Sequence, residues 1–502
     1  PGQPHADRHL ITPLFAVQMA FPAPAKVPKP LELLVTAETP ASESENPIDS
    51  LRGVPDVDAA RDWLNARNIQ DIECIVPDLA GVARGKMMPT GKFFSGPVMT
   101  MPASIFAQTI SGDYPDDDDW FQHNPIDGDL YFKPDYSTLT TVPWESDPTA
   151  QLIHDAVTRQ GAPVETAPRN VLKRVLKLYE DKGWEPVVAP EIEFYLVRPN
   201  TDPDYPLEPP RGRSGRPEVG RQSYSISALN EFDDLIDDIY DLSEQQGLEI
   251  DTMIHEEGAA QMEINLRHGQ PLALADQVFL FKRTIREAAL RHEMYATFMS
   301  KPMSNQPGSA MHIHQSVVDK ETGLNIFADE NGEETQAFLS FIAGHQRFLP
   351  RVTCIMAPFV NSYRRFSKTS TAPVNVYWGY DNRTVGLRVP YSNAQARRLE
   401  NRVPGSDVNP YLAIAASLAC GYLGMVHGLK PDSPKSDDCS ERSKSLPRGL
   451  PEALAKFEKS DEMIEVFGEQ FVATYRAIKY EEFETFMSVI SPWEREYLLL
   501  NV

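Results

Sequence analysis

Residues 187–197, with the sequence VVAPEIEFYLV, decide the fold of this chain. With the two-residue period of a strand, Val188 and Phe194 share one face, whereas Glu191 and Glu193 share the other. The acidic face of such a strand borders either solvent or a polar cavity. A solvated face is the ordinary interpretation of one strand, so the rest of the chain must decide.

The same alternation returns in four later stretches that carry metal-ligating or anion-binding residue types. Their polar faces hold Gln261, Glu263, Asn265 and Arg267; His312, His314 and Ser316; Arg388; and Arg398, Glu400 and Arg402. Several strands with one apolar face and one face of Glu, His and Arg predict a curved sheet around a polar cavity.

The acidic residues of such a cavity would repel one another. Two carboxylates about 4 Å apart at an effective dielectric constant of about 20 repel by roughly 4 kcal/mol. The acidic residues of these stretches therefore need counter-charge, which a pair of divalent cations, neighbouring arginines or both would supply.

Length and composition limit the class of protein. The chain has 502 residues and a net charge of −24. This length predicts two structured domains plus tails, and residues 1–51, rich in Pro, Ala, Ser and Glu, are expected to form a disordered tail. The negative charge argues against binding to nucleic acid or anionic membranes. The negative charge is explained either by solubility or by a cationic substrate.

Cysteine usage and hydropathy indicate the compartment. The chain has only Cys74, Cys354, Cys420 and Cys439. Without CxxC spacing they predict free thiols in a reducing compartment, so a cytoplasmic location is expected. The apolar run at 411–426 is too short for a membrane span and predicts a buried helix. Residues 10–25 faintly resemble a signal segment, but prolines interrupt them.

Strand and helix patterns mix along the chain without βαβ regularity, which predicts an α+β fold. Apolar stripes predict helices over residues 58–67, 228–246, 276–299 and 451–487. A strand over 72–76 is expected to enter a hairpin that turns at Ala80 and Gly81. The acidic run at 116–119 is either a solvated loop or a gate for a cationic substrate. P-loop, Rossmann and HExxH motifs are absent from the sequence.

Six dispersed motifs, in order, give the chain a family resemblance. They are Pro-Glu-Ile-Glu-Phe at 190–194, His255-Glu256 with Gln261-Met262-Glu263, Lys301-Pro302-Met303 with Gly308 to His314, Asn361-Ser362-Tyr363-Arg364-Arg365, Asn382 to Arg388, and Ala396 to Arg402 running into Asn409-Pro410. From about residue 52 onward, the chain closely resembles the glutamine synthetase family. The resemblance implies an N-terminal β-grasp domain at 52–165 and a catalytic domain at 166–502, with a curved antiparallel sheet (split barrel) backed by helices.

Roles for single residues follow from the resemblance, position by position. One metal would be held by Glu193, Glu256 and Glu263, and a second by Glu191, His312 and Glu400. Glutamate or its phosphorylated form would contact Gly308, His312, Arg365 and Arg402. ATP and the transferred phosphoryl group would contact His314, Ser316, Arg383, Arg388 and Arg398, and the resemblance gives catalytic roles to Arg365, Arg383 and Arg402.

The implied reaction activates the γ-carboxylate of glutamate with ATP as an acyl phosphate, which an amine then attacks. A glutamate-rich site with one imidazole suits two or more Mg²⁺ or Mn²⁺ ions. Arginine forks suit the phosphoryl group. The expected partners are therefore ATP, L-glutamate and an amine, and the resemblance also implies a homo-oligomer, as a hexameric ring or a dodecamer, with residues 102–121 completing a neighbour's site.

The departures from the family pattern concern ammonium. Thr371 stands where the family has an acidic residue before Ala-Pro, and residues 102–106 replace an Asp-Gly-Ser-Ser motif. Within the family the likeness is greatest to γ-glutamylpolyamine synthetases, in particular the γ-glutamylputrescine synthetases, through residues 378–390 and 396–424. The leading hypothesis is a ligase that joins glutamate to putrescine or another polyamine.

Three alternatives stay open. In the first, the acceptor is an apolar monoamine, such as an alkylamine, an aniline or an aromatic ethylamine, and its pocket is lined by Phe106, Trp120, Phe121 and Trp378. As isolated aromatic residues, these are more often part of a core. The second alternative is an ammonia-using glutamine synthetase, and the third is a non-catalytic relative.

Overall fold

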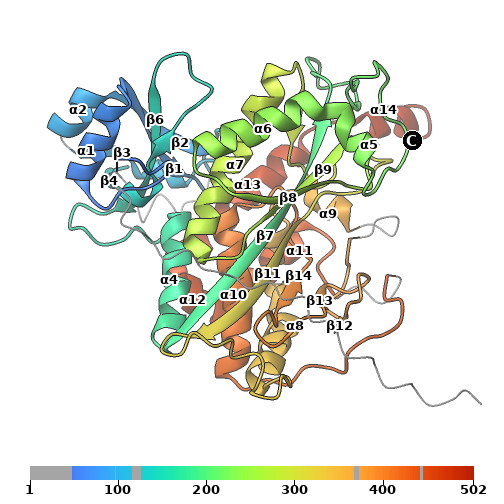
Figure 1. Cartoon of the computed structure of the whole chain (residues 1–502). Coiled ribbons are helices and arrows are strands. Elements are labelled where there is room, and N and C mark those ends of the chain that lie inside the picture. The colour runs from blue at the N-terminus through green and yellow to red at the C-terminus, as the bar shows by residue number, and fades with distance from the viewer. Residues whose placement is uncertain (1–47, 97, 116–125, 367–371, 441–444) are drawn as a thin grey trace, which may run out of the picture. The chain divides into compact units, whose positions relative to one another are not determined.

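The computed structural model describes the chain except for residues 1–47, 97, 116–125, 367–371 and 441–444. Residues Asn46–Val502 form one compact unit. Helices and strands mix within it, which confirms the α+β class (Figure 1). Most of the expected tail, the acidic run at 116–119, Trp120, Phe121 and Thr371 lie outside the described residues.

The N-terminal sheet has six strands in the order β2-β1-β6-β4-β3, with β5 paired to β6. Its strands are β1 Asp71–Pro77, β2 Ala83–Pro89, β3 Met99–Pro102, β4 Asp129–Pro134, β5 Thr140–Thr141 and β6 Thr149–Val157. The predicted hairpin joins β1 to β2, and the Asp78 carboxylate closes its turn by accepting hydrogen bonds from the amides of Ala80 and Val82. The division of the chain near residue 165 stays a prediction.

The second sheet has eight strands in the order β12-β13-β14-β11-β7-β9-β8, with β10 paired to β7. Its strands are β7 Trp184–Val197, β8 Ile250–His255, β9 Gln261–Leu266, β10 Tyr295–Thr297, β11 Met311–Asp319, β12 Trp378–Tyr380, β13 Leu387–Val389 and β14 Leu399–Asn401. All pairs except β12 with β13 are antiparallel. The apolar face of β7 is buried in the main hydrophobic core, as its alternation predicts.

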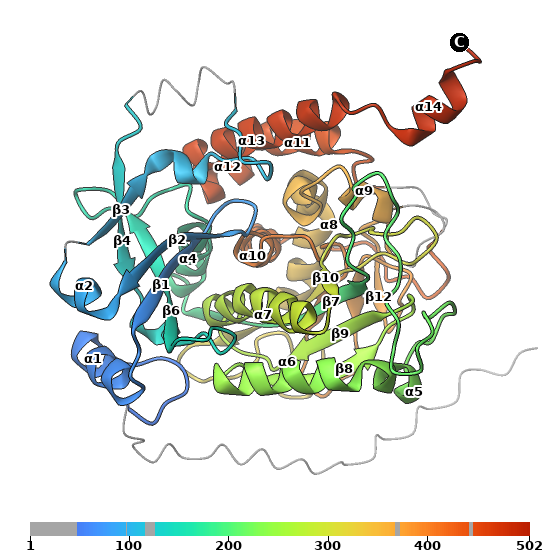
Figure 2. The same cartoon turned by 90° about the horizontal axis from the view of Figure 1, so that it is seen from above.

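Helices cover the apolar side of this sheet (Figures 1 and 2). The helices of the described chain, of which α1 and α2 lie with the N-terminal sheet, are α1 Val57–Ala66, α2 Thr90–Ser95, α4 Pro168–Glu180, α5 Ile226–Leu229, α6 Asp233–Gln245, α7 Pro271–Arg291, α8 Gln336–Met356, α9 Ser362–Arg365, α10 Pro410–Val426, α11 Leu450–Glu458, α12 Asp461–Phe467, α13 Glu469–Met487 and α14 Pro492–Leu498, with short 3-10 turns η1 Ala103–Phe106, η2 Tyr136–Thr138 and η3 Asn230–Phe232. Helix α10 is buried as predicted, and the Asn409 side chain caps its N-terminus. No helix in the described part of the chain is long and apolar enough to cross a membrane.

Two predicted helices differ from the observed ones. The helix expected over 276–299 ends at Arg291, because the chain turns at Glu293 (φ +56°) and then forms β10. Ala296 is therefore a strand residue paired with Leu196. The helix expected over 228–246 is broken by a 3-10 turn at Asn230–Phe232, so that its regular part is α6.

A buried arginine in α4 links several elements of the two halves. The Arg169 side chain is 2% exposed, and its nitrogens lie 2.7 Å from Asp135 Oδ2, 2.6 Å from Asp155 Oδ1 and 2.8 Å from Asp276 Oδ2. The Tyr411 hydroxyl also donates to Asp276. One cation thus forms ion pairs with acids from the N-terminal sheet region and from α7.

Replacing Arg169 with methionine is expected to destabilise the fold by about 3–5 kcal/mol, because it leaves buried carboxylates without their cation. Urea unfolding at neutral pH measures the loss. Lys177→Met on the same helix is the matched control. Its ion pairs are solvent-exposed, so it is expected to change stability by less than about 1 kcal/mol. Equal unfolding midpoints for the two variants would contradict the structural role of Arg169.

Because the His345 ring in α8 is buried, we expect the protein to lose stability in acid. Its Nε2 accepts a hydrogen bond from the Gln315 amide, so the buried ring is neutral, and burial lowers its pKa from 6.5 to about 4. Below pH 6.5 the unfolded state gains this proton before the folded state does. The free energy of unfolding is therefore expected to decrease as the pH is lowered. At pH 5, His345 alone should account for about 2 kcal/mol of this decrease. Denaturant titrations at pH 7 and pH 5 should show a smaller fall for His345→Gln.

Candidate functional site

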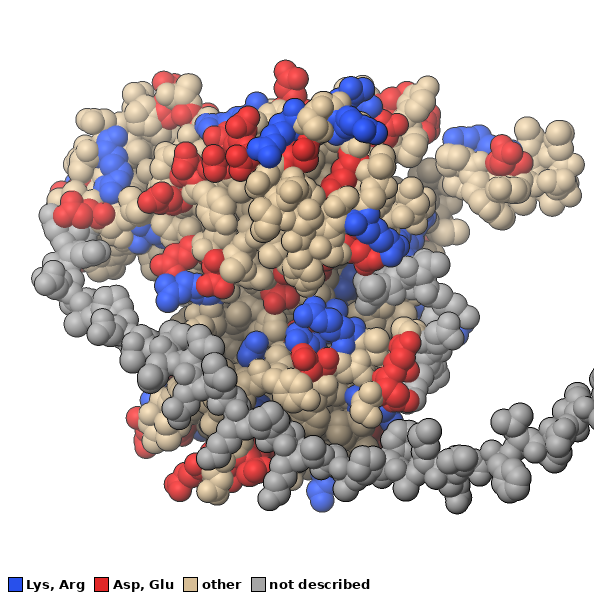
Figure 3. Space-filling model, turned by 45° about the vertical axis from the view of Figure 1, so that its right-hand side comes forward, with Lys and Arg blue, Asp and Glu red and all other residues tan. Residues whose placement is uncertain are grey.

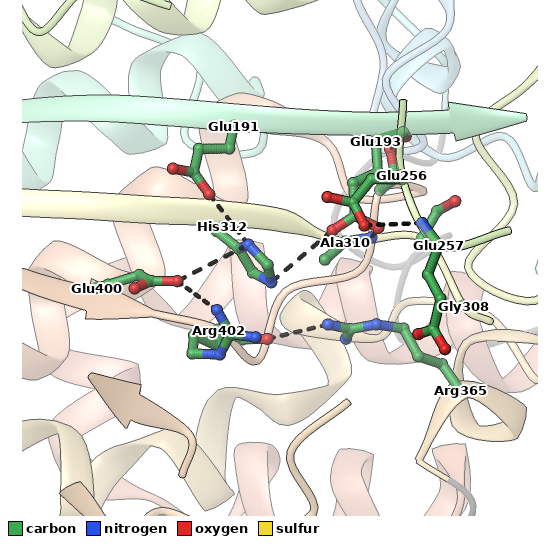
Figure 4. Close-up of polar contacts among 12 residues, drawn as sticks. Glu191, Glu193, Glu256, Glu257, Gly308, Ala310, His312, Arg365, Glu400 and Arg402 are labelled. Carbon is green, nitrogen blue, oxygen red and sulfur yellow. Dashed lines mark hydrogen bonds and ion pairs between the residues drawn. The ribbon is translucent and has the colours of Figure 1, made fainter. Parts of the chain in front are cut away.

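Strand β7 lies between β9 and β11, and the register of these pairs gathers the predicted polar residues. Glu193 is directly opposite Glu263, and Glu191 is directly opposite His312. Across the next pair, His314 is opposite Glu400. Figure 4 shows Glu191, His312 and Glu400 converging from β7, β11 and β14. The strand register thus brings the acidic side chains of the alternating stretches together in one place, called the acidic cavity below.

Hydrogen bonds hold the two glutamates of β7 in different environments. His312 Nδ1 lies 3.2 Å from Glu191 Oε2, and His314 Nε2 lies 2.8 Å from Glu191 Oε1. Glu193 instead accepts from the Ala310 amide (2.9 Å) and from Gln261 Nε2 (3.0 Å). Its free oxygen lies 4.0 Å from His312 Nε2, toward the centre of the cavity.

Arginines surround the carboxylate of Glu400. Arg402 Nη1 lies 2.6 Å from Glu400 Oε1, and Arg388 Nη1 lies 2.7 Å from Glu400 Oε2. Although burial opposes it, the charge of Arg402 and of the two histidines lowers the pKa of Glu400 to about 2. Glu400 is therefore ionised at neutral pH.

In the described part of the chain, no arginine lies within ion-pair distance of the carboxyls on the other side, Glu193, Glu256 and Glu263. Burial, followed by repulsion from Glu191, Glu193 and Glu256, raises the pKa of Glu263 to about 10. Burial and repulsion from Glu256 raise the pKa of Glu193 to about 8. Burial also raises the pKa of Glu256, against which exposed Arg383 acts weakly. This half of the cavity favours either protons or an added cation.

The donor set fits a hard divalent cation. One oxygen or nitrogen from each of Glu191, Glu263 and His312 lies within 4.8 Å of the others, and Glu191, His314 and Glu400 form a second such group. Carboxylate oxygens with few imidazoles suit Mg²⁺ or Mn²⁺. These groups divide the residues differently from the ligand sets implied by the resemblance, so the division between two ions stays a prediction.

Gly308 and Arg365 lie side by side at one end of the cavity (Figure 4). The Arg365 side chain is buried, and its two terminal nitrogens donate to the carbonyls of Val403 (2.8 Å) and Arg402 (3.0 Å). A Cβ on Gly308 would lie 2.6 Å from Arg365 Cγ. Only glycine allows this approach, so the pair forms a rigid cationic wall beside Glu193.

A pocket of about 590 Å³ lies beside the acidic cavity. Glu191, His314, Ser316 and Arg398 line it, together with Asn265 and Arg267. Arg398 Nε donates to His314 Nδ1 at 3.1 Å. The volume is typical of a small-molecule site, and three of the residues predicted to contact ATP line it. Arg388 pairs with Glu400 and Asp381 instead, and Arg383 is exposed.

One residue of the site was missed by the sequence reading. Asp407 is half-buried and accepts hydrogen bonds from Ser300 Oγ and Ser362 Oγ, both at 2.7 Å. It thereby ties the start of α9, which carries Arg365, to the segment before Gly308. Its place two residues before the helix cap at Asn409 is the only signal in the sequence, and a loop residue has no period that reveals its partners.

Two aromatic residues considered for an acceptor pocket are buried in the cores. Phe106 packs among the residues of the N-terminal core, and Trp378 packs in the main core, where its indole nitrogen donates to the Asp432 carbonyl. On the face drawn in Figure 3, acidic and basic side chains are interspersed around a hollow and do not form one basic field.

Comparisons with known proteins show the family of this chain. The family profile described as "Glutamine synthetase, catalytic domain" matches residues 165–498. The chain belongs to the glutamine synthetase family. Among its relatives in this family, gamma-glutamylputrescine synthetase PuuA of Escherichia coli is 35% identical, over 86% of this chain and 92% of PuuA.

Two further relatives extend the comparison. Glutamate–isopropylamine ligase of a Pseudomonas species is 33% identical, over 86% of this chain and 96% of that protein. A solved structure of GmaS without ligand superposes with a TM-score of 0.74 at 27% identity, covering 88% of this chain and 99% of GmaS. Members of the glutamine synthetase family thus match both sequence and fold over most of the chain.

Proposed function

We propose that this chain is an ATP-dependent ligase that joins the γ-carboxylate of glutamate to an amine, with putrescine or another polyamine as the acceptor. The observation that carries the proposal is the convergence of Glu191, Glu193, His312 and Glu400 beside the buried Arg365 (Figure 4), with Glu263 directly opposite Glu193. Acids and fixed guanidinium groups side by side suit the binding of cations, phosphates and a carboxylate substrate.

The chain's own residues would position the substrates for two displacement steps. Arg365 and the neighbouring Gly308 would hold glutamate, and His314, Ser316 and Arg398 would line the nucleotide pocket. A γ-carboxylate oxygen attacks the γ-phosphorus of ATP, so that ADP leaves and an acyl phosphate forms. The uncharged amine then attacks the acyl carbon, phosphate leaves, and the new amide nitrogen loses a proton.

The six residues Glu191, Glu193, Glu256, Glu263, His312 and Glu400 would hold the divalent cations. When bound, such ions would supply positive charge against the oxygens of ATP and of the acyl phosphate. Arg388 and Arg402 already neutralise Glu400. The added cations would therefore act mainly on the opposite carboxyls, Glu193, Glu256 and Glu263, and their binding would release protons from Glu193 and Glu263.

The choice of a polyamine acceptor rests on two arguments. The family's acidic residue before Ala-Pro is replaced by Thr371, which removes a base and anion suited to ammonium. PuuA, a γ-glutamylputrescine synthetase by its name, is 35% identical over most of the chain. A monoamine acceptor is the second candidate, because a glutamate–isopropylamine ligase is 33% identical over a similar share.

The test is ADP release from ATP and glutamate across a panel of amines. Ammonium, putrescine, spermidine, isopropylamine, phenylethylamine and aniline are compared, each with Mg²⁺ and with Mn²⁺. We expect kcat/KM to be highest with putrescine or spermidine and low with ammonium. A preference for isopropylamine or another monoamine would change the proposed acceptor but not the proposed reaction. If none of the amines causes ADP release, the proposed ligase activity is rejected.

The proposal extends to assembly. By analogy with its family, we expect the chain to form a hexameric ring or a pair of stacked rings, with residues 102–121 reaching a neighbouring subunit. Light scattering on the purified full chain measures the mass. A monomer that retains full activity would remove the role proposed for this segment.

A further inference from the structure

A second pocket, of about 470 Å³, lies outside the acidic cavity, between the β1–β2 turn, α7 and β10. Helix α7 and β10 lie beside each other (Figure 2). Much of the lining is apolar, with Val82, Phe279, Phe298, Met299 and Phe359 among its residues. The size and the lining are those of a site for a small organic molecule.

Lys282 of α7 supplies a buried cation at this pocket. Its Nζ donates to the carbonyls of Ser406 (2.6 Å) and Val408 (2.9 Å). An ammonium group has three donors, so one remains for a ligand. Burial, together with the charge of Arg286, lowers the pKa of Lys282 to about 7. A buried cation with this shift has less counter-charge around it than its ionised form requires.

Arg286, one turn further along α7, adds a second cation. Its side chain is exposed and lies 4.9 Å from the Phe298 ring centroid, and no carboxylate of the described residues lies within ion-pair distance of it. Arg283, between them, is already paired with Glu73 at 2.7 Å. Asp407 is the acid that lines the pocket. Among the residues that line the pocket, Arg286 is therefore a cation without a carboxylate partner.

We propose that this pocket binds a small organic monoanion, a carboxylate with an apolar body, through Arg286 and the free donor of Lys282. The apolar body would lie against Phe279, Phe298 and Phe359. One carboxylate would give Arg286 the partner that it lacks, and a guanidinium group can bind a carboxylate with two parallel hydrogen bonds.

The position of the pocket also couples it to the cavity. Asp407 accepts hydrogen bonds from Ser300 and from Ser362, the first residue of α9. Asn361, another lining residue, bonds both to the Lys301 amide and to the Lys301 carbonyl. A ligand in the pocket would therefore contact residues that hold the segments of Arg365 and Gly308 in place.

Calorimetric titration of the full-length protein with phenylacetate, in saturating L-glutamate, tests the proposal. Glutamate occupies the cavity, so that binding there is suppressed, and calorimetry reports binding whether or not the ligase reaction occurs. Phenylacetate is expected to bind at least about tenfold more tightly than the neutral phenylacetamide, because only the carboxylate makes charge-assisted bonds.

The variants locate the site. Arg286→Leu should weaken phenylacetate binding at least about tenfold, and Arg286→Lys should retain part of it. Arg291→Leu is the matched control on the same helix, since Arg291 is exposed and contacts the Pro143 carbonyl away from the pocket. Absence of phenylacetate binding at millimolar concentration, or equal binding by Arg286→Leu and wild type, would overturn the proposal.

Discussion

Replacing Glu263 with glutamine is expected to lower kcat for ADP release at least about 100-fold. Glu263 lies opposite Glu193 and groups with Glu191 and His312 in the candidate cation site. Glutamine keeps the shape but is a neutral, weaker ligand for a hard cation. Initial rates over a range of Mg²⁺ and Mn²⁺ concentrations measure the effect, which should persist when the ion is in excess.

In the absence of metal, the same substitution should increase the stability of the fold, although it lowers activity. Burial and neighbouring acids raise the pKa of Glu263 to about 10. At pH 7 the unfolded state releases this proton, whereas the folded state keeps it, so wild-type stability falls as pH rises from 4.5. Glu263→Gln avoids this loss, and without metal its free energy of unfolding should exceed that of wild type by up to about 3 kcal/mol.

Glu249→Gln is the control for both measurements. Its carboxylate is exposed and pairs with the exposed Arg267 at 3.2 Å. Activity and stability should both stay near wild type. Near-normal turnover by Glu263→Gln at saturating Mg²⁺ would remove Glu263 from the ligand set.

Most of the site could be predicted because its residues lie on strands. A period of two places Glu191 and Glu193 on one face of β7, and similarly His312 and His314 on one face of β11. Once the opposite faces are buried, only one register keeps the polar faces together. The pattern therefore leads to the cavity without knowledge of any contact.

The features that could not be predicted depend on contacts across the sheet or on single backbone angles. Cross-strand distances decide which acids share an ion. The family resemblance places His314 at ATP, whereas in the structure its Nε2 lies 2.8 Å from Glu191 Oε1. The end of α7 depends on a positive φ at Glu293, a residue without Gly-like freedom. The apolar stripe continues into Ala296, since that residue is buried as part of a strand.

Arg365→Lys is expected to raise the KM for glutamate about 30-fold, with a smaller change in kcat. Arg365 is buried and uses two nitrogens at once, for the carbonyls of Val403 and Arg402. Lysine keeps the charge but has one nitrogen on a flexible stem and cannot span both carbonyls. Burial, which already lowers the pKa of Arg365 to about 10, would also disfavour a charged lysine there.

Steady-state kinetics with varied glutamate at fixed ATP and amine distinguishes this role from a general loss of structure. Arg364→Lys is the matched control, because Arg364 is the adjacent residue of α9 and is exposed. It should leave KM and kcat unchanged. If Arg365→Lys also binds glutamate with wild-type affinity, the substrate carboxylate is held by another cation, and Arg402, whose Nη1 already pairs with Glu400, becomes the candidate to test.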